Sequence, residues 1–124
     1  MTDLLYKDES SKIIGSCFKV HTELGPGFLE SVYPEALEKQ FTKDDIHCVR
    51  EKKLRIQYDD FLLDKFFKSD FVCYDKIIVE LKSTPMIYKK DEEQLVNYLK
   101  ATNIKLGILV CFGSRSLIYK RLLN

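Results

Sequence analysis

The sequence predicts an α/β fold of the α+β type, in which helices flank a mixed β-sheet. Two segments with apolar residues at helical spacing come first, and strand-like segments separated by short turns follow. One more helical segment then separates these strands from two final ones. A meander of three strands followed by a crossover helix to a further strand gives a mixed sheet. The expected order is therefore α-α-β-β-β-α-β-β.

The first helix is expected to begin at a cap on Ser10 or Ser11 and to end at about Leu24. Glycine just past the last turn, followed by proline, ends it at Gly25-Pro26-Gly27. A second helix is expected over residues 29–42, with Pro34 tolerated only in its first turn. The residues expected to face inward on this helix are Val32, Tyr33, Ala36, Leu37 and Phe41.

The middle of the chain predicts strands. Residues 47–50 lead into residues 54–58, where apolar and polar side chains alternate as on a half-buried strand. After a turn at Asp59-Asp60, one strand is expected from residue 61 to residue 74, and the next covers residues 77–82.

The last third predicts a helix over residues 90–101, after a break at Ser83-Thr84-Pro85. Residues 104–112 are almost continuously apolar, which is typical of a central strand buried on both faces. Residues 117–122 form a last short strand. Because no linker, repeat or low-complexity segment interrupts the pattern, residues 1–124 are expected to form a single domain.

Asp70 and Glu80 are the most informative pair in the chain. If the turn after residue 74 is centred on Asp75, each carboxylate lies five residues from it. The two then face each other across the hairpin, with Cβ atoms about 5 Å apart. Like charges directly opposite on neighbouring strands are destabilising, so a compensating charge is needed. A divalent cation would supply it, with Lys82 on the same face as Glu80.

Oxygen ligands of this kind suit Mg²⁺ or Mn²⁺. The expected ligands are Asp70, Glu80 and the backbone carbonyl of Leu81, completed by water and a substrate phosphate. Such a metal neutralises charge on a phosphate and activates water, which indicates a phosphodiester-cleaving site. Lys82 would position the attacking water or stabilise the developing charge. The alternative is that these are solvated strand residues; it is weakened because Val79 and Leu81 point to the opposite side, toward the core.

Two further pairs lie on helix faces. Glu30 and Tyr33 are three residues apart, and Gln94 and Tyr98 are four apart. Glutamine bonds a phosphate, a water or a carboxylate, and tyrosine offers a hydroxyl and a ring. Taken singly, such residues are more often ordinary surface or core residues.

The motif GxxExxY is present as Gly27-Phe28-Leu29-Glu30-Ser31-Val32-Tyr33, directly after His21-Thr22-Glu23-Leu24-Gly25-Pro26. With these motifs the chain resembles the GxxExxY family of small prokaryotic proteins. That family is placed in the PD-(D/E)xK nuclease superfamily, near its RecB-type and lambda-exonuclease-like branch. The resemblance extends from about Lys12 to Leu122. It implies a restriction-endonuclease-like fold and a nuclease that uses Mg²⁺ or Mn²⁺.

The branch carries an acidic residue on an early helix, then Asp, Glu-x-Lys and Gln-x-x-x-Tyr. The matching positions here are Glu30, Asp70, Glu80 with Lys82, and Gln94 with Tyr98. The resemblance implies that Glu30 supports the metal or its water. It also implies that Gln94 and Tyr98 shape the substrate side, and Tyr33 of the GxxExxY motif is a further substrate-binding candidate. The chain departs from the branch at Phe66, where glycine is usual four residues before the aspartate.

Composition excludes several other classes. The charged fraction is 31% and the net charge is +1, so any contact with nucleic acid must come from a local patch. The cysteines are scattered without a CxxC pair, which argues against a zinc site or a redox dithiol. Apolar surroundings indicate that Cys73 and Cys111 are buried thiols, which fits the cytoplasm. No segment has the character of a signal peptide or a membrane span.

The sequence thus supports three hypotheses about function. The first is a divalent-metal-dependent nuclease, with DNA as the expected substrate and in-line attack by water. The second is a nucleic-acid-binding or partner-binding module that has the fold without turnover. The third is a nuclease subunit that needs a partner chain. A homodimer, the choice between DNA and RNA, and the choice between endo- and exonuclease are all left open.

Overall fold

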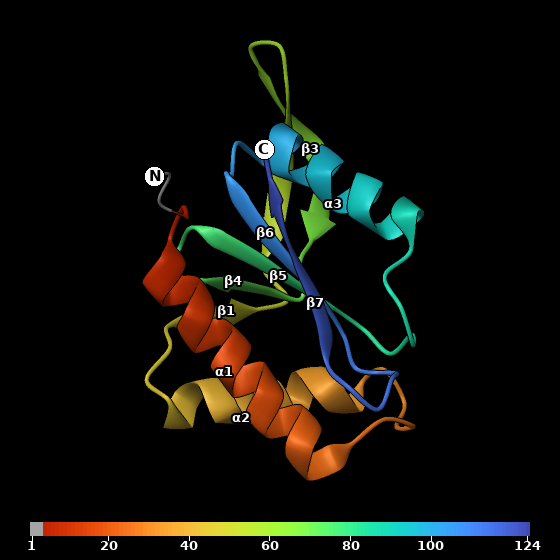
Figure 1. Ribbon diagram of the computed structural model, residues 1–124. Helices are drawn as coiled ribbons and strands as arrows, with labels where there is room; N and C mark the ends of the chain where they lie inside the picture. Colours follow the sequence, from red (N-terminus) through yellow and green to blue (C-terminus); the bar gives the residue numbers. More distant parts are fainter. Residues whose placement is uncertain (1–3) are drawn as a thin grey trace.

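The computed structural model describes residues 4–124, and the expected α+β architecture is confirmed (Figure 1). The helices are α1 (Lys7–Leu24), α2 (Val32–Lys43) and α3 (Lys89–Thr102). The strands are β1 (Cys48–Arg50), β2 (Lys53–Tyr58), β3 (Phe61–Lys68), β4 (Phe71–Cys73), β5 (Ile77–Lys82), β6 (Leu106–Cys111) and β7 (Ile118–Leu123).

Across the described residues, the main sheet has the order β1-β4-β5-β6-β7. Its neighbouring strands are antiparallel, except for β5 and β6, which pair in parallel. The parallel pair is the one connected through α3, because parallel neighbours need a crossover connection. The expected mixed sheet is therefore confirmed, and β6 is buried along its whole length as predicted.

The structure divides the strand that was expected from residue 61 to residue 74. At Glu51 the backbone takes a left-handed conformation (φ 55°), and the hairpin bends there. Two backbone hydrogen bonds hold the bend, from Glu51 N–H to the Asp70 carbonyl and from Ser69 N–H to the Lys52 carbonyl, each 2.9 Å. Beyond the bend, β2 and β3 form a separate two-stranded sheet, here called the arm, which projects at the top of Figure 1.

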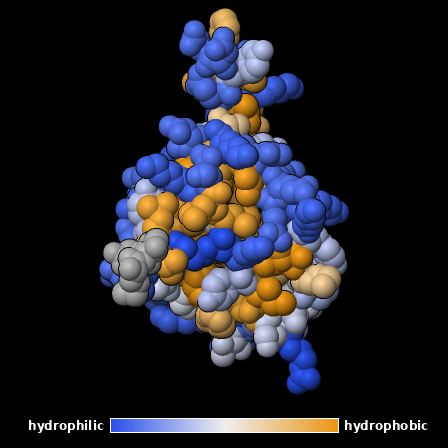
Figure 2. All heavy atoms as spheres, turned by 45° about the horizontal axis from the view of Figure 1, so that its top comes forward, coloured by the Kyte–Doolittle hydropathy of each residue, from blue (hydrophilic) through white to orange (hydrophobic). Residues whose placement is uncertain are grey.

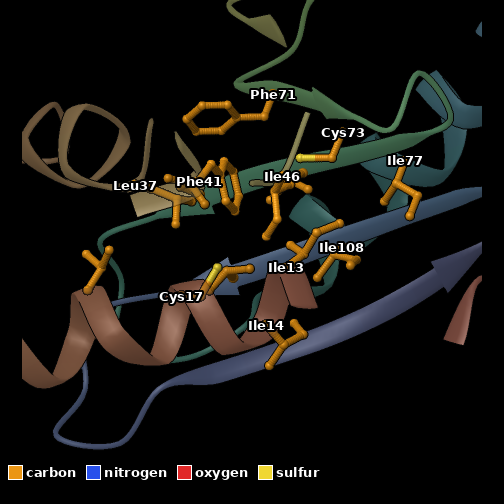
Figure 3. Packing of buried hydrophobic residues seen from close by; sticks show 14 of the residues in the cluster. Ile13, Ile14, Cys17, Leu37, Phe41, Ile46, Phe71, Cys73, Ile77 and Ile108 are labelled. Atoms are coloured by element: carbon orange, nitrogen blue, oxygen red, sulfur yellow. The ribbon is translucent and has the colours of Figure 1, made fainter. Parts of the chain in front are cut away.

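One face of the main sheet is covered by α1 and α2 (Figure 1). Figure 3 shows Ile13 and Cys17 of α1 near Ile108, and Leu37 and Phe41 of α2 in the same layer. Each fully buried side chain of this kind contributes about 1.5–3 kcal/mol. This layer therefore fixes the sheet that carries Asp70 and Glu80.

The opposite face of the main sheet is covered by α3 and the arm. Leu95 and Leu99 of α3 pack there with Ile78 of β5 and with Phe67 of the arm. The Phe67 ring stacks on Tyr98 of α3, with centroids 3.9 Å apart and planes 10° from parallel. The arm is thus anchored to α3 at its base.

The helix starts differ in part from expectation. The expected cap of α1 at Ser10 or Ser11 is wrong, because the helix already begins at Lys7. Asp8 and Glu9 lie in its first turn, where negative charge favours the helix, and Ser10 donates to the Tyr6 carbonyl (2.7 Å). In α2, Pro34 lies in the first turn, as predicted.

Candidate functional site

The two acidic residues of the hairpin face each other. Phe71 pairs with Val79 and Cys73 with Ile77, so Asp70 comes opposite Glu80 and the turn is centred on Asp75, as expected. The main-chain N–H of Leu81 donates to Asp70 Oδ2 (2.8 Å), and the N–H of Asp70 donates to Glu80 Oε2 (2.6 Å). Each carboxylate is therefore held by an amide of the facing strand, and both lie on one side of the sheet.

Burial and mutual repulsion make the pair hard to ionise. Burial, followed by the charge of Asp70, raises the pKa of Glu80 to about 8, against the opposing effects of the Asp70 amide and Lys82. Burial also raises the pKa of Asp70, although the Leu81 amide and Lys82 act in the other direction. Two carboxylates in this position hold a proton at neutral pH unless a cation neutralises them.

The backbone carbonyl of Leu81 points toward Asp70 and so offers a third oxygen ligand in addition to the two carboxylates. The Lys82 carbonyl accepts from Phe112 N–H (2.8 Å) and so faces β6, whereas the Leu81 N–H faces Asp70. Because successive peptide groups of a strand point to alternate sides, the Leu81 carbonyl points toward Asp70. Leu81 and Asp70 line the same cavity.

This donor set fits a small divalent cation. Among residues 4–124, no three His, Cys, Asp or Glu side chains gather into a ready-made metal cluster. Magnesium is usually held by only one or two carboxylates and completes its shell with water and substrate phosphate. Asp70, Glu80 and the Leu81 carbonyl match that pattern.

A cavity of about 320 Å³ opens beside Asp70. It is bounded by the start of α2 and by the bend at Glu51, at the base of the arm. Its lining residues are Glu30, Ser31, Pro34, Arg50, Glu51, Asp70 and Leu81. The negative charge of Glu30 contributes to the raised pKa of both Asp70 and Glu80. The structure therefore brings Glu30 to the acidic pair, although the two come from distant parts of the chain.

A second, much smaller pocket lies on the α3 side of Glu80. It is lined by Phe67, Glu80, Lys82, Asp91, Gln94, Leu95, Tyr98 and Leu109. The Lys82 ammonium lies 3.9 Å from Asp91 Oδ1. Lys82, Gln94 and Tyr98 are thus grouped around Glu80, and the acidic pair lies between the two cavities.

A sequence model of the PD-(D/E)XK nuclease superfamily matches residues 7–122. The chain belongs to this superfamily. No curated protein and no solved structure gives a significant match to the chain. Membership agrees with the restriction-endonuclease-like mixed sheet and with the general resemblance seen in the sequence. Nucleases of this superfamily generally use divalent metals, which agrees with the chemistry of the oxygen donors around Asp70.

Among the predicted side chains, Tyr33 is the one that lines neither of the two cavities beside Asp70 and Glu80. Its side chain is 1% exposed, and its ring stacks on Phe112 with centroids 4.6 Å apart. The hydroxyl donates to the Gly25 carbonyl (2.8 Å) and accepts from Phe28 N–H (3.2 Å). Through these hydrogen bonds Tyr33 holds the loop that carries Glu30, and its predicted part in substrate binding stays a prediction.

Sequence reasoning missed two residues that the structure places beside the candidate site. Asp91 lies in the first turn of α3 and against Lys82. Its place three residues before Gln94, on the same helix face, would have indicated this. Arg50 lines the larger cavity and pairs with Glu38 (3.2 Å), while its Nε atom is buried without a partner among the described residues. Its position just before the bend would have revealed it only with the strand register known.

Proposed function

We propose that this chain is a divalent-metal-dependent phosphodiester hydrolase of the GxxExxY branch that cuts DNA. The observation that carries the proposal is the pair Asp70 and Glu80, which are buried and face each other. Their pKa values are raised, and a bound cation would lower them by neutralising the two negative charges. The proposed ligands of Mg²⁺ or Mn²⁺ are these two carboxylates and the Leu81 carbonyl. When bound, such an ion neutralises phosphate charge and lowers the pKa of water.

The other side chains then have distinct roles. The Lys82 ammonium, held 3.9 Å from Asp91, orients the attacking water or stabilises the charge that develops on phosphorus. Glu30, across the larger cavity, accepts a hydrogen bond from that water. Gln94 and Tyr98 border the substrate side, and the unpartnered Nε of Arg50 is a donor for a phosphate oxygen.

We infer the location from the thiols. All the cysteines are free, which supports a reducing compartment such as the cytoplasm. In the part of the chain that the structure describes, no helix is both long and apolar enough to cross a membrane.

The test is cleavage of plasmid and labelled oligonucleotides in Mg²⁺ by the wild type, Asp70→Asn and Glu80→Gln. We expect both variants to lose more than about 100-fold, since disturbing even groups that merely support a metal ligand loses 10- to 100-fold. Glu93→Gln is the matched control, because Glu93 is exposed on α3 and its one ion pair within residues 4–124 is with Lys89. Full activity in either site variant would refute the assignment.

Binding without turnover is the competing function. Retention of labelled DNA that is unaffected by EDTA, together with no cleavage by the wild type, would establish this alternative in place of hydrolysis.

A further inference from the structure

The two faces of the arm differ in character. Lys53 pairs with Lys68, Leu54 with Phe67, and Arg55 with Phe66. Since paired residues of antiparallel strands point to the same side, Leu54 and Phe67 turn toward α3. Lys53, Phe66 and Lys68 share the opposite side, which is here called the outer face. Figure 2 shows the arm at the top of the molecule, where apolar and hydrophilic residues are interleaved.

The outer face combines a half-exposed aromatic ring with two lysines that lack a carboxylate partner among the described residues. Phe66 is 48% exposed, although the Lys53 ammonium lies 5.0 Å from its ring centroid. Within residues 4–124, neither Lys53 nor Lys68 forms an ion pair with a carboxylate. Arg55 is different, because the carbonyls of Leu62 and Leu63 and the Asp64 carboxylate occupy its guanidinium.

Lys53 and Lys68 lie directly opposite each other on the two strands, and their like charges destabilise the arm when no ligand is bound. A polyanion relieves that repulsion, and the exposed ring of Phe66, two residues along β3 from Lys68, is a surface on which a flat base stacks. We propose that the outer face binds single-stranded nucleic acid, with one base on Phe66 and phosphates on Lys53 and Lys68. This proposal rests on the proposed function and names its substrate class.

The position of the outer face supports the same substrate. Lys68 precedes Asp70 by two residues, and Lys53 follows Glu51 of the larger cavity by two. A strand rises about 3.3 Å per residue, so the two residues between each lysine and the site span at most about 7 Å. We therefore infer that a nucleic-acid strand bound on the arm reaches the cavity beside Asp70.

An unpaired strand fits this face better than a duplex does. A protein ring stacks on a base only if the face of that base is accessible. Inside a duplex, each face is covered by the neighbouring base pair, so the Phe66 ring cannot reach it. The net charge of +1 gives no general attraction to DNA, so the local lysines and the ring must provide the affinity. Stacking accepts every base, which predicts binding without sequence preference.

The experiment measures fluorescence anisotropy of labelled oligo(dT), oligo(U) and a blunt DNA hairpin in EDTA, where no cleavage occurs. The proteins are the wild type, Phe66→Ala, Phe66→Trp and the control Phe61→Ala, whose aromatic ring is exposed at the far end of the arm. We expect Phe66→Ala to bind single strands about 5- to 100-fold more weakly, the range for one stacked base. Phe66→Trp should retain binding, and Phe61→Ala should resemble the wild type.

Two further readouts sharpen the result. Lys53→Ala and Lys68→Ala should each reduce the salt dependence of single-strand binding by about 0.7 in log–log slope. The tighter of oligo(dT) and oligo(U) assigns DNA or RNA, and binding of either through Phe66 supports the proposal. Equal effects of Phe66→Ala and Phe61→Ala, or tighter binding of the hairpin by the wild type, would overturn it.

This outcome is separable from the proposed function. Cleavage that is unchanged in Phe66→Ala on single strands would leave hydrolysis standing and remove the outer face as a binding site. Binding that depends on Phe66, with no cleavage in Mg²⁺, would keep the outer face as a binding site and remove hydrolysis as the function.

Discussion

At the scale of single residues, the acidic pair is a source of instability that the fold retains. Asp70 and Glu80 are held against each other by main-chain amides, and Lys82 is the nearest compensating charge. An arrangement of this kind is typical of a site that is completed by a ligand, because buried unpaired charge is otherwise removed by protonation. Two predictions follow from the proton that Glu80 keeps.

The first concerns stability and pH. The pKa of Glu80 in the folded chain is about 8, above its ordinary value of 4.5. Between these values the folded chain holds a proton that the unfolded chain has released, so Glu80 makes the stability fall as the pH rises. We expect Glu80→Gln to remove this slope and to be more stable than the wild type at about pH 8 in EDTA.

Urea unfolding of both proteins, at about pH 5 and about pH 8, checks this expectation. Glu93→Gln should keep the slope of the wild type, since Glu93 is exposed and lies outside both cavities. Parallel pH profiles for the wild type and Glu80→Gln would show that Glu80 titrates normally.

The second concerns Mg²⁺ binding. A divalent ion binds only the ionised pair, so at about pH 7 its binding should release close to one proton. Isothermal titration calorimetry in two buffers of different ionisation enthalpy measures this number directly. Glu80→Gln should bind Mg²⁺ more weakly and release no proton. Binding of equal strength in both proteins would place the ion elsewhere.

At the scale of elements, loops and helix ends set the positions of the site residues. The Tyr33 hydroxyl ties down the loop before α2, and His21 Nε2 lies 2.8 Å from the Ser114 carbonyl in the loop after β6. After β6, Gly113 passes so close to the loop after β5 that a Cβ there would lie 2.3 Å from the Ser83 carbonyl oxygen. These contacts keep the ends of β5 and β6 together beside Lys82.

Asp44 joins the two N-terminal helices and provides a prediction at this scale. It follows α2 and accepts from Ser16 Oγ (2.6 Å) and Lys19 Nζ (2.9 Å) of α1, and from Gln40 (3.1 Å). These hydrogen bonds lower the pKa of Asp44 from 3.8 to about 2, and the bond from Ser16 has the largest effect. Its contribution is therefore fully present above about pH 4 and is lost as the pH falls toward 2.

We expect Asp44→Asn to be less stable than the wild type at neutral pH, with a difference that shrinks as the pH falls through this window. Thermal unfolding followed by circular dichroism from neutral to acid pH measures it. Asp45→Asn, at the exposed neighbouring position, is the control. A difference that stays constant down to about pH 2 would mean that the charge of Asp44 plays no part.

At the scale of the whole molecule, the sequence predicted the architecture because its periodic segments are long and its turns carry local signals. The short hairpin around Asp75 gave the Asp70–Glu80 register in the same way. The bend could not be predicted, since Glu51 adopts a positive φ without glycine and Ser69 is buried by tertiary contacts. The burial of Tyr33 depends on Phe112, which is distant in the sequence, and the position of Arg50 depends on the strand register, so no local pattern revealed either role.

The bend has a mechanical consequence. Asp70 lies at the pivot of the arm, and its own N–H is the donor that holds Glu80. Any tilt of the arm about this pivot displaces that donor, so a load applied at the distant hairpin tip is transmitted through the backbone to the acids.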